Sequence, residues 1–412
     1  MKFTDSQKYH VSAGDMVLII SMFLLICIGF ISIYSATSGH QGTALSMNFQ
    51  HQIYWFILGI ILILLTINFP PQFYQALSYA IYGVIVVSLI AVLFVGKAGG
   101  GAERWLAFGG FRFQPSEWAK LATILALARY LADHHDKLRQ KKYLLISAAI
   151  GLLPMLLIFK QPDLGTSLVF VFIVPSMMYW AGVSPLILFL TFLPGLTMIA
   201  SFKLWSFFLI MGILIGVLYA TKKNLLFSIS NLLLNISVGI FTPFLWNSLE
   251  AYQQKRVLSF LGLVSDPKGV SYQVIQSKVA IGSGGVTGKG FLAGTQTQLR
   301  FLPEQHTDFI FSVIGEEFGF LGGAITLLLF IIILIRGIQI AAKIKNRFAS
   351  LVSIGITTML LFHFFVNIGM VTGIMPVTGL PLPFVSYGGS FLITSMIAVA
   401  LLLNFSIRKH QY

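Results

Sequence analysis

Long apolar runs dominate this chain of 412 residues, and about twelve of them are long enough to cross a lipid bilayer as a helix. Hydrophobic residues make up 57% of the chain and charged residues only 10%, which is too little charge to cover the surface of a soluble protein. The sequence therefore predicts an all-α fold, a polytopic integral membrane helical bundle with about twelve transmembrane helices. The runs lie near residues 16–36, 53–69, 73–95, 115–132, 143–160, 165–182, 184–202, 205–221, 225–246, 308–335, 349–372 and 390–408.

The connections between these runs differ in charge, and this difference predicts the orientation. With the N-terminus in the cytoplasm, the inner connections hold most of the Lys and Arg residues of the short loops, as the positive-inside rule requires. We therefore expect both termini in the cytoplasm and one membrane domain over 1–412, which includes a large extracytoplasmic loop at 247–307. The inner basic residues are Lys2, Lys8, Arg129, Lys137, Arg139, Lys141, Lys142, Lys222, Lys223, Arg336, Lys343, Lys345, Arg347, Arg408 and Lys409.

The net charge of +14 does not indicate a protein that binds nucleic acid, because Lys and Arg stand at the ends of apolar runs rather than along one polar segment. The first run, 16–36, is longer than the apolar part of a secretory signal peptide, and many runs follow it. We expect it to be the first transmembrane helix. The single cysteine, Cys27, excludes an intrachain disulfide.

Three outer segments, 96–118, 247–307 and 373–390, are rich in Gly, Pro, aromatic and charged residues. The inner connections are short or simply basic. Nine of the 13 acidic residues fall on or just below the outer face, as an acid–base site on that face would need. We therefore expect the chemistry there. The nine are Glu103, Glu117, Asp163, Glu250, Asp266, Glu304, Asp308, Glu316 and Glu317.

Glu117 and Lys120 stand three residues apart at the start of the run 115–132, directly after Pro115. This spacing puts both side chains on one face of a helix. An ionisable pair at the edge of a bilayer is costly and normally lines a cavity or marks a site. An ion pair that ties two helices together explains the pattern equally well, so both interpretations stay open.

Two further carboxylates stand next to prolines. Asp163, in the segment KQPDLG, follows a Pro between two helices and can act either as a helix N-cap or as a catalytic group. Asp266, in SFLGLVSDPKGVSYQ, has turn signals on both sides. A carboxylate on such a loop can take a proton from a sugar hydroxyl, although Asp-Pro turns are also common without any function. Glu316 and Glu317 point to different faces of one helix, so we expect them to have different partners, either neighbouring helices or substrate.

Other motifs are weaker. The glycine-rich segment 282–290 resembles a phosphate-binding loop, but Ser283 and Gly290 stand where that motif needs Gly and Ser or Thr. His306 and Asp308 have no further His or Cys nearby in the sequence, so we expect no metal site in the protein itself. The outer basic residues either attract anionic headgroups or cradle a lipid-linked pyrophosphate. They are Arg104, Arg112, Lys120, Lys160, Lys255, Arg256, Lys268, Lys278, Lys289 and Arg300.

Four segments together resemble the SEDS family (shape, elongation, division and sporulation). They are RWLAFGGFRFQPSEWAK, KQPDLGTS, the stretch from SDPKGVSYQ to EEFG, and GIMPVTGLPLPFVSYGGS. They follow the family's order over nearly the whole chain, and the third is very specific. The stretches PVTGLPLPFVSYGGS and RFLPEQHTDFIF are more similar to elongation-type members than to division-type members.

The resemblance implies a peptidoglycan glycosyltransferase, which extends glycan strands from lipid II on the outer leaflet and releases undecaprenyl pyrophosphate. It assigns catalysis to Asp266, as the general base that takes the proton of the acceptor's 4-hydroxyl while that oxygen attacks the donor's anomeric carbon. Arg104 and Trp105 match the family's outer-loop motif and are candidates for substrate binding. The other candidates are Glu117, Lys120, Asp163, Lys278 and Ser386.

The resemblance also implies a place in the bacterial inner (cytoplasmic) membrane, with the active site on the periplasmic face. The implied partners are a class B penicillin-binding protein, which is a transpeptidase, and the elongation machinery. The resemblance by itself assigns no cofactor, and pyrophosphate chemistry makes Mg²⁺ or Mn²⁺ plausible. Family members have about ten spans, so the stretch 184–246, with three predicted spans instead of one, departs from the pattern.

Three alternatives remain: a lipid II flippase, a division-type polymerase and a non-enzymatic scaffold. A transporter should also place ionisable groups near the midplane of the membrane. The clustering of acids on the outer face therefore favours the enzyme.

Overall fold

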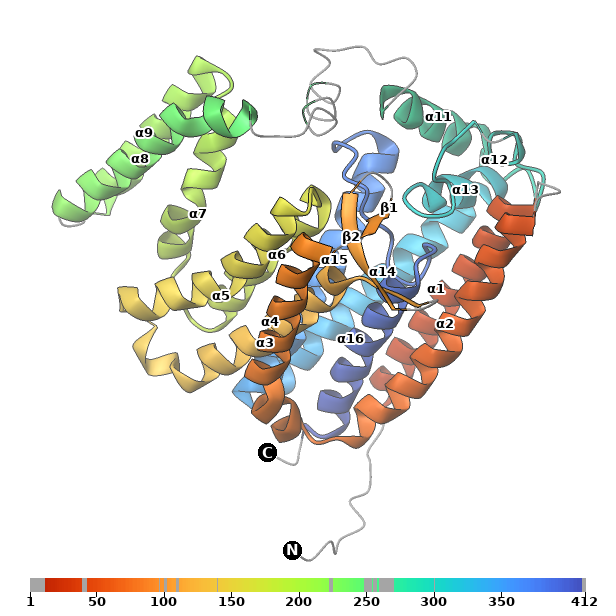
Figure 1. The fold of residues 1–412 in the computed structure, drawn as a ribbon, viewed down its shortest axis with the longest axis horizontal. Helices are drawn as coiled ribbons and strands as arrows, with labels where there is room; N and C mark the ends of the chain where they lie inside the picture. The colour runs from red at the N-terminus through yellow and green to blue at the C-terminus, as the bar shows by residue number, and fades with distance from the viewer. Residues whose placement is uncertain are drawn as a thin grey trace, which may run out of the picture. The chain divides into compact units, whose positions relative to one another are not determined.

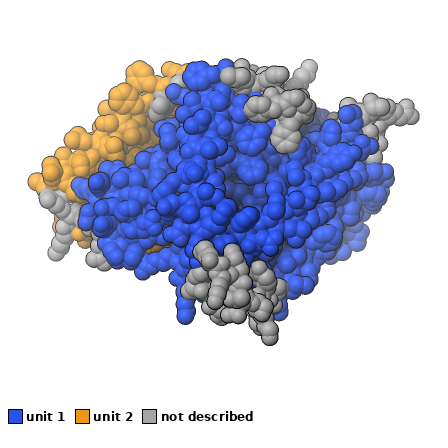
Figure 2. All heavy atoms as spheres, turned by 60° about the horizontal axis from the view of Figure 1, so that its bottom comes forward, with its two compact units in different colours: residues 1–177, 256–412 blue, residues 178–255 orange. Residues whose placement is uncertain are grey.

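The computed structural model describes residues 12–38, 43–95, 97–99, 102–108, 111–138, 140–221, 225–247, 254, 258, 270–299 and 301–409. Long helices make up most of it (Figure 1), which confirms the predicted polytopic helical membrane fold. The chain divides into two compact units, coloured in Figure 2: unit 1 is 1–177 with 256–412, and unit 2 is 178–255.

Unit 1 holds most of the membrane helices. They form a bundle because their side chains are apolar almost all round and can face either lipid or one another. In the described part of the whole chain, eight helices are long and apolar enough to cross a membrane. The unit 1 helices of the bundle are α1 (Ala13–Ser38), α2 (Thr43–Asn68), α3 (Pro71–Val95), α4 (Pro115–Asp133), α5 (Lys141–Lys160), α6 (Leu164–Trp180, whose last turn enters unit 2), α14 (Gly319–Lys343), α15 (Arg347–Thr372) and α16 (Gly389–Ile407).

Unit 2 is built from three helices, which correspond to the three spans predicted within 184–246. They are α7 (Pro185–Ala200), α8 (Leu204–Ala220) and α9 (Leu225–Asn247). Leu193 of α7 and Leu214 of α8 pack in their shared apolar core. The Thr197 hydroxyl donates to the Asn235 side-chain oxygen of α9 at 2.6 Å, a polar link of the kind that joins helices inside a membrane.

One end of unit 1 gathers basic residues, and we name it the basic end. Here α1 begins and α16 ends, since the Ser406 hydroxyl donates to Asp15 at 2.5 Å. The end of α4 joins the start of α3, because Arg129 donates to the carbonyl of Gln75 at 3.0 Å. The start of the first helix and the end of the last helix therefore lie on one side, as predicted. The described basic residues at this end are Arg129, Lys137, Lys141, Lys142, Arg336, Lys343, Lys345, Arg347, Arg408 and Lys409.

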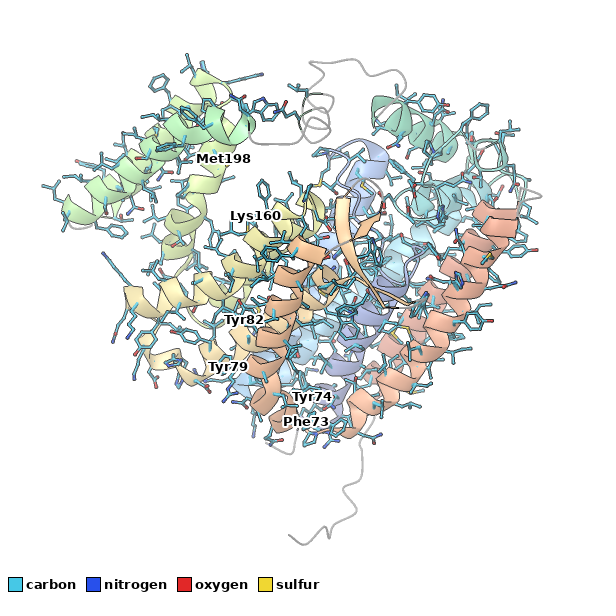
Figure 3. All side chains as sticks on the ribbon, viewed as in Figure 1. Phe73, Tyr74, Tyr79, Tyr82, Lys160 and Met198 are labelled. Carbon is cyan, nitrogen blue, oxygen red and sulfur yellow. The ribbon has the colours of Figure 1, made fainter. Side chains whose placement is uncertain are left out.

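The opposite end carries the long connections, and we name it the loop end. Lys160 lies toward this end, whereas Phe73 and Tyr74 lie toward the basic end (Figure 3). Three short helices, α11 (Val270–Ser283), α12 (Thr295–Gln298) and α13 (Ile310–Glu317), belong to the loop end. The side chain of Gln305 donates to the carbonyl of Ala36 at 2.9 Å and so ties these connections to the end of α1.

α15 and α16 are the central helices of unit 1. In the most apolar stretch of α16, 83% of the residues are buried, against 17% for α2, so α2 faces mainly lipid. Close approach to α15 depends on a missing side chain at Gly355. A β-carbon there would meet Ile124 of α4 and Met177 of α6 at 2.8 Å. Small residues allow this kind of packing between membrane helices.

Two elements differ from the predicted layout. The run 308–335 was expected as one span, but it is broken into α13 and α14, because Gly319 adopts the left-handed backbone conformation with φ of 63°. The outer segment 96–118 contains a small antiparallel sheet of β1 (Lys97–Gly99), β2 (Ala102–Phe108) and β3 (Phe111–Phe113). Aromatic residues in β2 and β3 favour the extended chain.

Asn404 offers a test of how the basic end is held together. Its side-chain amide donates to the carbonyls of Thr66 and Phe69 at 2.6 and 2.7 Å, which closes the end of α2. Asn404→Ala leaves these carbonyls without that donor, so we expect a loss of about 1–3 kcal/mol in the free energy of unfolding. Thermal unfolding in detergent measures this loss. Asn68→Ala, which removes an exposed amide bonded within its own helix, is the control. Equal effects of the two changes would contradict the assignment.

Candidate functional site

The start of α4 carries an ion pair that is almost completely buried. Pro115 occupies the first turn, where its missing N–H costs nothing. Glu117 and Lys120 are 3% and 1% exposed, and the Lys120 Nζ lies 2.8 Å from the Glu117 Oε2. The two residues therefore share one helix face, as their spacing predicts. Burial of two charges carries a desolvation cost that a single ion pair often does not repay.

A third ionisable group completes this arrangement. His363 of α15 places its Nε2 2.9 Å from the Lys120 Nζ, and the Phe391 ring of α16 lies 5.2 Å from the same ammonium. An ammonium can only donate, so Nε2 accepts and the geometry assigns the imidazole proton to Nδ1. Glu117, Lys120 and His363 thus form a buried cluster that joins α4 to α15.

The loop 373–388 and the start of α6 converge just beyond this buried cluster. One helical turn past His363, the Asn367 side chain donates to the carbonyls of Asp308 and Leu380 at 2.9 and 2.8 Å. A β-carbon on Gly165, in the first turn of α6, would lie 3.2 Å from the Leu380 side chain. Parts of the four segments that resemble the SEDS family therefore meet at one place, although they are far apart in the chain.

Asp163 lies directly before α6 and is 6% exposed. Its carboxylate accepts from the backbone N–H of Thr166 at 3.2 Å and from the Thr166 hydroxyl at 3.0 Å. This is the geometry of a helix N-cap, one of the two roles that the sequence left open. A contact of Asp163 with substrate stays a prediction.

Ser386 and Lys278 lie in different parts of the loop end. The Ser386 hydroxyl donates to the carbonyl of Thr307 at 2.6 Å and accepts from the N–H of Leu382 at 2.8 Å, so it closes the turn of the loop 373–388. Lys278, which is exposed on α11, lies over the end of α15, because a β-carbon on Gly373 would meet its Nζ at 2.6 Å. No contact described for either residue joins it to the buried cluster.

Three predicted site residues, Arg104, Trp105 and Asp266, belong to segments that the structure describes only in part. Asp266 lies outside the described residues. Arg104 stands in β2, but its side chain is outside the described part. Trp105, also in β2, is half-buried. The sheet lies next to the start of α4, because the rings of Phe113 and Trp118 are 6.0 Å apart.

Glu316 lies at the end of α13, before the span of α14 begins, and it organises the connection between α11 and α13. Its carboxylate accepts from the Lys289 ammonium and the Gln296 N–H, both at 2.8 Å, and from the Thr297 N–H at 3.0 Å. Burial alone would raise the pKa of Glu316, but these hydrogen bonds outweigh it and lower the pKa. Lys289 of the glycine-rich segment therefore binds a carboxylate of the protein itself.

Glu317 has a different partner, as its neighbouring position predicts. It accepts a short hydrogen bond from the hydroxyl of Ser35 in α1. Burial raises the pKa of Glu317 above the ordinary value, and the hydrogen bond from Ser35 only partly offsets this. Glu317 therefore ties the loop end to α1, whereas Glu316 holds the connections of the loop end together; both are packing roles that the sequence allowed.

His363 is the residue of the cluster that was not among the predicted site residues. The signal was present, because a lone ionisable side chain inside the run 349–372 is costly unless it has a partner. Among the described residues, no group of three or more His, Cys, Asp and Glu side chains is placed to hold a metal ion. A divalent ion is therefore assigned to none of the described residues.

Comparisons with known proteins agree with this architecture. The family model of the FtsW, RodA and SpoVE proteins, described as cell cycle protein, matches residues 15–208 and 186–411. Peptidoglycan glycosyltransferase MrdB of Escherichia coli K12 is 37% identical, over 100% of this chain and 96% of that protein. Peptidoglycan glycosyltransferase RodA of Treponema pallidum is 35% identical, over 97% of this chain and 99% of that protein.

A solved structure extends the likeness to the fold. It comes from work on the structural coordination of polymerization and crosslinking by a peptidoglycan synthase complex. The matching chain is 31% identical with a TM-score of 0.70, over 96% of this chain and 98% of that one. Matched in sequence and in fold along almost its whole length, the chain belongs to the SEDS family, the family of FtsW, RodA and SpoVE.

Proposed function

We propose that this protein is a peptidoglycan glycosyltransferase that polymerises lipid II into glycan strands at the outer leaflet of the bacterial inner membrane. The observation that carries the proposal is the buried cluster of Glu117, Lys120 and His363 at the loop end of a chain whose full-length relatives are named peptidoglycan glycosyltransferases. The basic end then faces the cytoplasm, as the positive-inside rule requires. The start of α1 and the end of α16 lie at that end.

The buried cluster supplies what a lipid-linked pyrophosphate needs. An ammonium has three N–H donors, and Glu117 and His363 account for two of them on Lys120. No acceptor is described for the third, and in this proposal a phosphate oxygen of the donor takes that place. Neutral His363 accepts a hydrogen bond from the ammonium, so it orients the ammonium without repelling it. A preorganised cation in a dry site stabilises the negative charge that develops on the leaving pyrophosphate.

Asp266 completes the reaction as the general base. It takes the proton from the 4-hydroxyl of the acceptor sugar while that oxygen forms a bond to the anomeric carbon of the donor. The bond from this carbon to the phosphate oxygen breaks, and undecaprenyl pyrophosphate leaves. Support for this role is the family motif around the residue. Mg²⁺ or Mn²⁺, where present, neutralises the pyrophosphate of the substrate, and no step of this mechanism depends on it.

The proposed partner is a class B penicillin-binding protein, which crosslinks the new strands. The similar solved structure supports it, because that structure is of a peptidoglycan synthase complex in which polymerization and crosslinking are coordinated. The likeness to the solved structure of the rod shape determining protein RodA of Thermus thermophilus supports a role in elongation and rod shape rather than in division. Arg104, Trp105, Asp163, Lys278 and Ser386 are the further proposed substrate contacts.

Replacement of Asp266 tests the general base. In vesicles that contain the purified protein and lipid II, we expect Asp266→Asn to reduce glycan polymerisation by about 10²–10⁴-fold. Asp136→Asn, at an exposed position near the basic end, is the matched control and should polymerise like the wild type. A wild-type rate for Asp266→Asn would remove this residue from the mechanism. Translocation of lipid II without any polymer would identify a flippase instead.

A double substitution separates a site from a helix-packing role in the buried cluster. Glu117→Gln with Lys120→Met removes both charges at similar volume, so the free energy of unfolding should stay the same or rise. If Lys120 contacts the pyrophosphate, polymerisation falls by about 10²–10³-fold. Thermal unfolding and polymer yield are measured on the same sample. A stable variant with full activity would assign the pair to packing alone.

Cysteine labelling tests the orientation. In a background where Cys27 is replaced by Ser, cysteines are placed at Lys160, toward the loop end, and at Lys345, at the basic end; both positions are exposed. A membrane-impermeant maleimide should label Lys160→Cys in intact spheroplasts and Lys345→Cys only after permeabilisation. The reverse pattern would place the buried cluster near the cytoplasm and contradict the proposed function.

A further inference from the structure

A cavity at the basic end lies between the start of α1 and the ends of α14 and α16. It has a volume of about 270 Å³. The proposed reaction does not use it, because it lies at the end of unit 1 opposite the buried cluster. Its polar lining consists of Ser12, Arg336, Gln339, Lys343, Ser406 and Lys409.

The cavity is positively charged. Three cations line it, and the nearby carboxylate of Asp15 is fully buried and already satisfied. Asp15 accepts from the N–H of Ser12 at 2.8 Å and from the hydroxyl of Ser406 at 2.5 Å. Arg336 is its only described ion-pair partner, at 3.8 Å. One acid thus balances at most one of the three cations, and the cavity keeps a surplus for an anion.

Arg336 lies against the start of α1, and one of its donors has no described partner. Its guanidinium lies on Gly14, where a β-carbon would be 1.9 Å from Nη2, and its Nη1 donates to Gln339 at 2.7 Å. Its Nε is buried and has no hydrogen-bond partner among the described residues. The first turn of α1 also lines the cavity, and it is capped internally, since the Ser12 N–H donates to the Asp15 carboxylate and the Asp15 N–H to Ser12. A guanidinium beside two lysines in one cavity suits a phosphate group.

Two simpler explanations account for the charges but not for this geometry. Cations at the inner end orient a membrane protein, and they also offset the negative ends of α14 and α16. Neither role needs a cavity or a guanidinium that is fixed against a glycine. The surroundings favour a lipid over a soluble phosphate, because Met16, Val17 and Ile20 of α1 and Ile338 of α14 are exposed close by. These side chains can cover an acyl chain.

We propose that this cavity binds the headgroup of an anionic phospholipid, with its phosphate between Arg336, Lys343, Lys409 and the first turn of α1. The site is separate from the proposed active site, and it does not depend on the proposed reaction.

Lys343 and Lys345 provide a matched pair for a test. Both are exposed lysines at the basic end, but only Lys343 lines the cavity. The purified full-length protein in neutral detergent is titrated with phosphatidylglycerol, phosphatidylcholine or inorganic phosphate. Bound lipid is counted by native mass spectrometry, and the rise in unfolding temperature is measured in parallel. We expect phosphatidylglycerol to bind preferentially, Lys343→Gln to weaken it by about fivefold and Lys345→Gln to leave it unchanged.

Gly14→Ala keeps every charge and displaces only the guanidinium of Arg336. We expect it also to weaken phosphatidylglycerol binding. Because displacement of Arg336 loosens its ion pair with Asp15, the unfolding temperature is measured with and without lipid, and binding is read from the difference. Equal binding by the wild type, Lys343→Gln and Gly14→Ala would overturn the proposal. Equally tight binding of phosphatidylcholine, or competition by inorganic phosphate as potent as that by the lipid, would overturn the assignment to an anionic lipid.

Discussion

Inside a bilayer every backbone amide and carbonyl must find its partner within the protein, and this requirement shapes the whole molecule. Helices meet it by themselves along their length. At their ends, buried polar side chains take over. Asn404 closes the end of α2, Asn367 holds the loop 373–388 against α15, and Ser386 closes the turn within that loop. These side chains satisfy backbone groups where the described irregular segments of unit 1 lie against the helices.

The same requirement makes the buried cluster significant. Glu117, Lys120 and His363 are all nearly inaccessible, and each is bonded to another member of the cluster. A cluster of this kind is costly to build, and apolar side chains of the same size would join α4 to α15 at least as well. The cluster lies where parts of the four segments that resemble the SEDS family meet. This position is consistent with a site for a charged, lipid-linked substrate.

Much of this arrangement could be predicted from the sequence, because the strongest signals are local. Apolar runs gave nearly all the helices, charge in short loops gave the two ends, and the three-residue spacing put Glu117 and Lys120 on one face. Long-range partners could not be predicted in this way. The link from Lys120 to His363 joins residues 243 positions apart, and no periodicity reports such a distance. The break at Gly319 was missed because an apolar run hides a left-handed glycine.

The central claim is that the buried cluster receives the pyrophosphate of a lipid-linked sugar. A structure of the protein with bound lipid II, determined in the Asp266→Asn variant so that the substrate persists, tests it most directly. We expect a phosphate oxygen of lipid II within about 3 Å of the Lys120 Nζ. A lipid II molecule bound with its phosphates at the basic end, or elsewhere at the loop end with the buried cluster untouched, would contradict the claim.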